Sequence, residues 1–147
     1  MGWKDAEYCA KKWNGPFALK GVMSVEDAKR AIDIGCTAIM ISNHGGRQVD
    51  VGQATIDSLK DIAPLYKDKL TVMMDSGIRG GADVARVMAS GADFSFLGRT
   101  FMYGVSALGK KGGHHTIAML KTQLTQVMEQ LSCAQINDLQ NKLIRTF

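Results

Sequence analysis

Residues 37–48 read TAIMISNHGGRQ, an apolar run that passes directly into a polar, glycine-rich loop, and this stretch decides the fold. The run Thr37–Ser42 is apolar on both faces, which is typical of a strand buried in a parallel sheet. A helix is expected after the loop, from about residue 54 to residue 63. The order of strand, glycine-containing loop and amphipathic helix recurs on both sides of this unit.

Three further units of this kind are expected along the chain. Strands are expected at 16–22, 70–75 and 94–97, helices at 25–34 and 82–90, and two C-terminal helices at 114–130 and 134–142. Strands that alternate with helices predict an α/β fold of four parallel βα units plus C-terminal helices. Half of a (β/α)8 barrel and a doubly wound sheet fit this alternation equally well.

The composition is that of a globular protein, with 46% hydrophobic and 22% charged residues. No apolar run is long enough to span a membrane and no signal segment is recognised, so a cytoplasmic location is predicted. The net charge of +4 is spread along the chain, which argues against nucleic acid as a partner. A small anionic ligand suits this charge, and peripheral contact with an anionic membrane surface is compatible with it. The three cysteines are expected to be buried and reduced.

The loop after the strand at 37–42 carries the strongest chemical signal. His44 and Arg47 lie three residues apart beside two glycines. Imidazole exchanges protons near neutral pH, so His44 is a candidate general base. A guanidinium binds a carboxylate through two parallel hydrogen bonds, so Arg47 is a candidate substrate-binding group. The pair suits a substrate that carries a carboxylate next to the reacting carbon.

The string SNHGGRQVD, residues 42–50, closely resembles the signature of the FMN-dependent 2-hydroxy-acid dehydrogenases and oxidases. The resemblance runs from about Trp3 to the last helices and covers only the second half of the family's fold. It implies that residues 1–147 form a single partial domain, the C-terminal half of a (β/α)8 TIM barrel. It also implies FMN as cofactor and oxidation of an L-2-hydroxy acid of the lactate or glycolate type to the 2-oxo acid.

Other stretches match the same family in the right order. The resemblance implies that Lys20 and Ser42 contact the flavin, and that Asp75 contacts it as well and orients the catalytic His44. Residues 75–79, DSGIR, match a family string in which plant-type oxidases commonly have glycine in place of Ser76. The FMN phosphate is implied to lie on Gly77, Arg79, Gly98 and Arg99.

The resemblance leaves out the family's N-terminal half, which supplies substrate-contacting tyrosines and a second carboxylate-binding arginine. The active site is therefore expected to be incomplete in this chain alone. A half-barrel also leaves its inner face and both edge strands uncovered, so we expect a homo-oligomer or pairing with the missing half. Two alternatives to an active enzyme remain: a module that binds FMN or phosphate without turnover, and a self-associating half-barrel. No metal site is predicted, and His114 and His115 are expected in an exposed loop.

Overall fold

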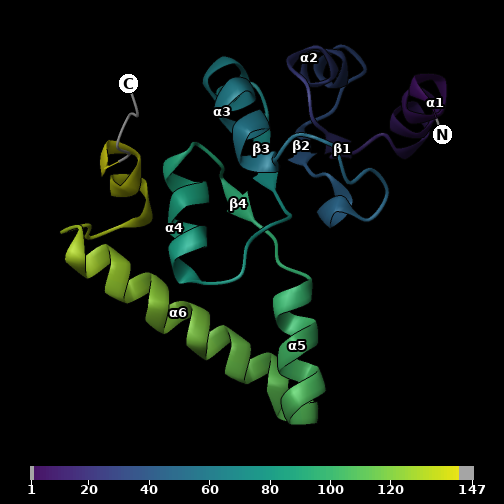
Figure 1. Ribbon diagram of the computed structural model, residues 1–147. Coiled ribbons are helices and arrows are strands. Elements are labelled where there is room, and N and C mark those ends of the chain that lie inside the picture. The colour runs from purple at the N-terminus through teal and green to yellow at the C-terminus, as the bar shows by residue number, and fades with distance from the viewer. Residues whose placement is uncertain (1, 143–147) are drawn as a thin grey trace.

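The computed structural model describes residues 2–142, and its elements follow the predicted alternation (Figure 1). The sheet has the order β1-β2-β3-β4 and all neighbouring strands are parallel. The strands are β1 (Ala18–Val22), β2 (Ala38–Ile41), β3 (Thr71–Met74) and β4 (Phe94–Ser95). The helices are α1 (Trp3–Trp13), α2 (Val25–Asp33), α3 (Thr55–Tyr66), α4 (Gly81–Ala89), α5 (Arg99–Leu108) and α6 (Gly112–Gln130), with the 3-10 helices η1 (His44–Gly46), η2 (Gly109–Lys111) and η3 (Ile136–Lys142).

The two faces of the sheet differ sharply in burial. Side chains alternate between the faces of a strand, and Ile39 and Val72 are fully buried on the face covered by helices α2, α3 and α4. The other face carries Met40 and Met73 in one register row with Lys20 and Phe94. Phe94 is 58% exposed. The second face and the edge strands β1 and β4 are therefore open, as expected for half of a barrel.

A bulge in β1 determines which of its side chains reach the open face. Lys20 pairs with Met40 and Val22 pairs with Ile41, so the register shifts by one residue between them. Gly21, with φ at 96°, takes the left-handed conformation that such an irregularity needs. Val22 is buried under the helices as a result, while Lys20 stays on the open side.

Helix α6 fixes the positions of α4 and α5, the two helices whose first turns border the C-terminal ends of the strands. It packs against both of them and extends below the sheet with α5 (Figure 1). Gln123 of α6 accepts a hydrogen bond from the backbone N–H of Gly81 at 2.8 Å. Gly104 and Gly112 let the backbones of α5 and α6 meet, since a Cβ at Gly112 would collide with the Gly104 carbonyl.

Several boundaries differ from the predictions. Helix α5 was missed, because it begins at a Gly-Arg pair, contains Gly104 and leaves Met102 and Tyr103 exposed instead of showing a polar face. Helix α6 begins at Gly112, so the loop predicted for the two histidines is wrong: His114 and His115 are exposed, but on a helix.

The remaining differences are local. Helix α3 continues past Pro64 to Tyr66, because a proline in the last turn removes only one backbone hydrogen bond. Strand β4 is two residues long, and the predicted last helix is the 3-10 helix η3. Cys36 and Cys133 are buried thiols as expected, whereas Cys9 is exposed, so that part of the cysteine prediction is wrong.

Candidate active site

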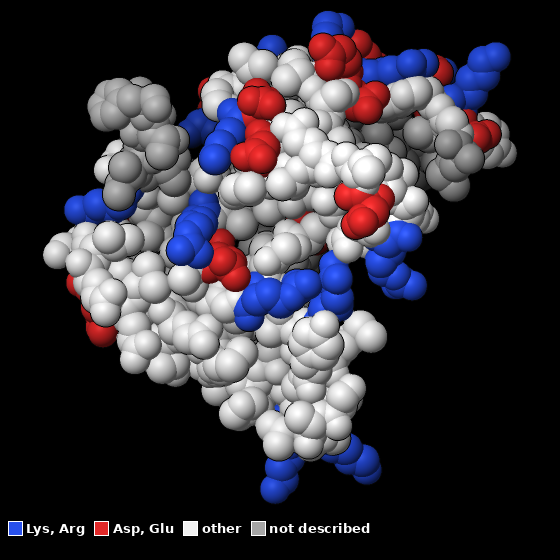
Figure 2. Space-filling model, viewed as in Figure 1, with Lys and Arg blue, Asp and Glu red and all other residues white. Residues whose placement is uncertain are grey.

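The predicted chemical residues meet at the C-terminal ends of the strands, around a hollow of about 430 Å³. Basic side chains border the notch between the main body and the α5 region in Figure 2. The predicted residues that line the hollow are Lys20, His44, Arg47, Asp75, Arg79, Gly98 and Arg99. Ser42 lies buried behind them, and Gly77 borders a smaller hollow of about 190 Å³ on the other side of the β3–α4 loop.

Lys20 and Asp75 form the ion pair at the centre of this hollow. The Lys20 ammonium lies 3.2 Å from an Asp75 carboxylate oxygen and donates to the Ser42 hydroxyl at 2.8 Å. Their side chains are 46% and 21% exposed, so the pair is partly shielded from solvent. Three consecutive strands of the sheet thus contribute one group each, since these residues lie within or directly after β1, β2 and β3.

The environment of Asp75 favours the ionised carboxylate. Burial alone would raise the pKa of Asp75, but hydrogen bonds from Ser42, Ser76 and Lys20 and the charge of Lys20 outweigh it and hold the pKa below its usual value. A negative charge is therefore fixed next to the hollow at neutral pH.

The His44 loop has a backbone that few side chains tolerate. His44, Gly45 and Gly46 have φ angles of 55°, 68° and 74°, three consecutive residues in the left-handed region. Side chains of the same loop hold this shape, because Ser42 accepts the His44 N–H at 3.2 Å and Asn43 accepts the Gly45 N–H at 3.0 Å. Unusual backbone held by several hydrogen bonds is common at functional sites.

The contact between His44 and Asp75 is indirect in this structure. Among residues 2–142, the Asp75 carboxylate is bonded to Lys20, Ser42 and Ser76, and no direct hydrogen bond to the imidazole is present. Ser76 links the two segments, since its hydroxyl donates to Asp75 at 2.7 Å and accepts the Gly45 N–H at 3.0 Å. Asp75 lies beside the His44 loop, but its predicted orienting role stays a prediction.

Arg79, Arg99 and the start of α5 bring guanidinium groups and helix N–H groups to the hollow. Arg99 donates to the Gly45 carbonyl at 2.7 Å, which ties α5 to the His44 loop. The first turn of α4 is already capped by Asp83, whereas Gly98 before α5 supplies no side-chain cap. A Cβ built at Gly98 would meet nothing within 4 Å, so there is open space for a ligand. Uncapped N–H groups of a helix beside two guanidiniums fit a phosphate dianion.

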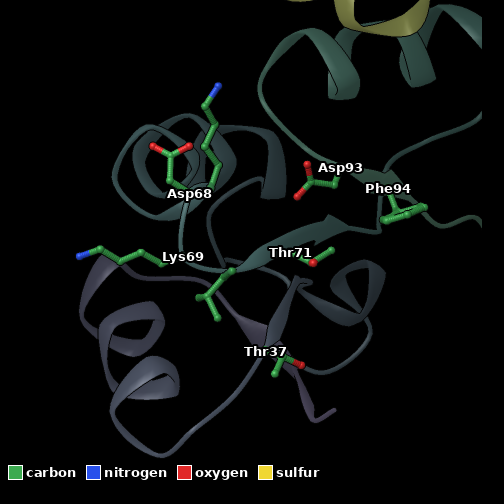
Figure 3. Close-up of a pocket in the computed structure, with 8 residues that line it drawn as sticks. Thr37, Asp68, Lys69, Thr71, Asp93 and Phe94 are labelled. Atoms are coloured by element: carbon green, nitrogen blue, oxygen red, sulfur yellow. The ribbon is translucent and has the colours of Figure 1, made fainter.

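A second hollow, of about 620 Å³, lies at the opposite ends of the strands (Figure 3). It is lined by Thr37, Lys69, Asp93 and Phe94 together with their neighbours. Asp93 is engaged with the backbone there, accepting the Val72 N–H at 2.7 Å. Neither histidine nor arginine lines this hollow, so it offers neither the base nor the guanidiniums found at the other end.

Sequence reasoning missed the bridging role of Ser76. Its partner Gly45 is 31 residues away, and only the parallel neighbourhood of β2 and β3 brings them together. The left-handed φ of 75° at Ser76 had no signal in the sequence beyond the following Gly77.

No metal cluster or membrane span accompanies the site in residues 2–142. No group of three or more His, Cys, Asp and Glu side chains converges on one point in this range. No helix in it combines the length and the apolar character that crossing a membrane requires. The cytoplasmic location stays a prediction.

Comparisons with known proteins agree with this geometry. The family model described as FMN-dependent dehydrogenase matches residues 1–146. An FMN-dependent alpha-hydroxy acid dehydrogenase of Penicillium citrinum is 44% identical over 126 residues, covering 86% of this chain and 31% of that protein. An L-lactate dehydrogenase of Actinobacillus pleuropneumoniae is 39% identical over 139 residues, covering 95% of this chain and 36% of that protein.

Solved structures give the same result. A crystal structure described as a lactate oxidase of Pediococcus acidilactici superposes with a TM-score of 0.89 at 40% identity, over 96% of this chain and 39% of that one. A mandelate oxidase structure superposes with a TM-score of 0.90 at 33% identity, over 96% of this chain and 43% of that one. The predicted partial TIM barrel and the predicted cofactor class are confirmed. The chain spans about a third of the length of these curated relatives, and it belongs to the FMN-dependent dehydrogenase family.

Proposed function

We propose that this chain supplies the base, the carboxylate-binding arginine and the flavin phosphate site for oxidation of an L-2-hydroxy acid of the lactate or glycolate type. One observation carries the proposal: His44 and Arg47 line the same hollow as the Lys20–Asp75 pair and the two phosphate-side arginines. The names of the relatives, L-lactate dehydrogenase and lactate oxidase among them, support the substrate class.

The residues divide into a substrate side and a cofactor side. Arg47 would bind the substrate carboxylate, and His44 would accept a proton from the substrate. The fixed negative charge of Asp75, two hydrogen bonds away through Ser76 and Gly45, would favour the imidazolium that forms.

FMN, when bound, supplies the two-electron acceptor for this oxidation. Arg79, Arg99 and the first turn of α5 would hold its phosphate, with Gly77 and Gly98 leaving the backbone accessible. Lys20, on the open side of β1, would place a positive charge beside the flavin ring, and buried Ser42 holds that ammonium in position.

Anaerobic addition of L-lactate to the FMN-loaded chain tests the proposal through bleaching of the visible flavin band. With a second copy or an N-terminal half completing the barrel, we expect the wild-type chain to bleach and His44→Ala to keep FMN while its bleaching rate falls by on the order of 10²–10⁴-fold. His114→Ala is the matched control, because His114 is an exposed histidine on α6 away from the hollow, and it should behave as wild type. Bleaching of His44→Ala at the wild-type rate would remove His44 from its proposed role.

A second function, FMN binding without turnover, is favoured by the open face of the sheet. Phe94 and Phe96 are 58% and 45% exposed on that side, so no part of residues 2–142 covers the open face beside the substrate region. Saturable FMN binding with no bleaching by L-lactate or glycolate would favour this function. The exposed face also supports pairing with a second copy or with an N-terminal half. Sedimentation of the chain with and without FMN would distinguish a pair of copies from a monomer.

A further inference from the structure

The Ser76 hydroxyl occupies the junction between the two segments that carry the proposed base and its carboxylate. It donates to Asp75 Oδ1 at 2.7 Å and accepts the Gly45 N–H at 3.0 Å. A hydroxyl has one proton to donate, and donation to an ionised carboxylate leaves its lone pairs free to accept the amide. Both bonds are made when Asp75 is ionised, and donation to a charged carboxylate is stronger than donation to a neutral carboxyl group.

Gly45, the residue that follows His44, is held through both of its backbone polar groups. Its N–H is bonded by Ser76 and Asn43, and its carbonyl accepts from Arg99 at 2.7 Å. Because His44 itself has a φ of 55°, the loop would relax toward more common backbone angles if Gly45 were released. The Ser76 contact is the one that connects it to the strand carrying Asp75.

The backbone conformation at Ser76 favours glycine over serine, which indicates that the serine hydroxyl contributes to the structure. Its φ of 75° lies in the left-handed region, where glycine is unstrained and serine is not. The next residue, Gly77, has a φ of 78°, so the turn already uses glycine where it can. The two hydrogen bonds of the hydroxyl offset the strain that serine adds.

We propose that Ser76 is a positioning residue that couples the ionisation of Asp75 to the conformation of the His44 loop. This inference rests on the proposed function for its catalytic meaning, but the coupling itself is a property of the free chain. Protonation of Asp75 weakens the Ser76 contact, and the weaker contact loosens the Gly45 amide.

The charged groups around Asp75 come from every element that borders it. Lys20 lies on β1, His44 and Arg47 lie in the loop after β2, Arg79 follows β3, and Arg99 opens α5. Only Lys20 of these is bonded to the carboxylate. Removal of the Ser76 hydroxyl therefore leaves the ion pair in place and changes one hydrogen bond to Asp75.

The test measures the Asp75 carboxyl titration by carbon NMR and the hydrogen exchange of the Gly45 amide in the flavin-free chain. Ser76→Ala removes the hydroxyl and keeps the strained side chain, whereas Ser76→Gly removes both. We expect both variants to raise the pKa of Asp75 and to speed Gly45 exchange by roughly three- to tenfold, the weight of one hydrogen bond.

Two control variants separate the hydroxyl from general effects. Ser132→Gly relieves a left-handed serine with φ at 55° elsewhere, and Ser58→Ala removes a buried hydroxyl that has no hydrogen-bond partner among residues 2–142. Neither control should change the Asp75 titration or Gly45 exchange. An unchanged Asp75 titration in both Ser76→Ala and Ser76→Gly would overturn the coupling. Wild-type protection of the Gly45 amide in Ser76→Gly but not in Ser76→Ala would also overturn it, because backbone strain and not the hydroxyl would then control the loop.

The NMR test of the coupling and the bleaching test of the proposed function can fail independently. If the wild-type chain fails to bleach with L-lactate but the Ser76 variants shift both NMR properties as expected, the coupling holds and the proposed oxidation fails. If the chain bleaches and the NMR properties do not respond to Ser76, the oxidation holds and the coupling fails.

Discussion

The two ends of the sheet are both hollowed, but their hydrogen bonds serve different purposes. At the N-terminal end, side chains complete the backbone: Asp93 accepts the Val72 N–H, and Thr37 accepts the Phe17 N–H at 3.2 Å. At the C-terminal end, side chains hold the backbone of the His44 loop in left-handed conformations and also bind one another, as Lys20 does with Asp75. One end is built to hold the strands together, and the other holds charged groups in place beside open space.

The largest expected effect concerns FMN affinity at the C-terminal end. Arg99→Ala removes a guanidinium beside the uncapped start of α5, and we expect the Kd for FMN to rise by roughly 10- to 100-fold, the weight of a charged hydrogen bond. Arg30→Ala removes an exposed arginine of α2 that lines neither this hollow nor the smaller one at Gly77 and should leave the Kd unchanged. Fluorescence titration measures the Kd of both variants, and an equal loss of FMN affinity in the two would contradict a phosphate site at Arg99.

The opposite pattern is expected at the N-terminal end. Asp93→Ala leaves the N–H of buried Val72 without its acceptor, and we expect the free energy of unfolding to fall by about 1–3 kcal/mol with no change in FMN affinity. Asp68→Ala removes a carboxylate from the same hollow and should change stability by less than about 0.5 kcal/mol. Urea unfolding provides the comparison, and a loss of FMN binding in Asp93→Ala would contradict the division between the two ends.

A smaller effect is expected from acid. The folded-state pKa of Asp75 is lowered, so its ionised form stabilises the fold above the usual value of 3.8, and this contribution is lost as the pH falls through the lowered value. Asp75→Asn should therefore lose less stability than wild type between pH 5 and strongly acidic conditions, as measured by urea unfolding across that range. Asp57→Asn, in an exposed ion pair with Lys60, is the control. An equally steep acid loss in Asp75→Asn would show that the carboxylate does not contribute.

The sequence predicted the two central strands, β2 and β3, best. The apolar runs at 37–42 and 70–75 each contain the observed strand with one residue to spare at either end, because glycine and polar residues bound them. Helix α5 escaped prediction because its exposed side is apolar and its position depends on contact with α6. A local sequence pattern does not reveal a helix whose position depends on packing against another helix.

The functional site, like the fold, was predicted only in part. The chemistry of their side chains pointed to His44 and Arg47, and the resemblance to the family implied Arg79 and Arg99. All four line one hollow because each follows a strand, and parallel strands bring their C-terminal ends together. The partners within the site were not predictable in the same way. Asp75 pairs with Lys20, which lies 55 positions earlier in the sequence, and it contacts the His44 loop through Ser76. Such contacts depend on side-chain directions that spacing does not encode.

The most direct test of the flavin site is a fluorescence titration of the wild-type chain with FMN and, separately, with riboflavin, which lacks the phosphate. Because Arg79, Arg99 and the start of α5 supply the anion-binding groups, we expect saturable binding of FMN and binding of riboflavin weaker by roughly tenfold or more. Equal affinity for the two compounds, or no saturable binding of FMN, would contradict a phosphate site at the C-terminal ends of these strands.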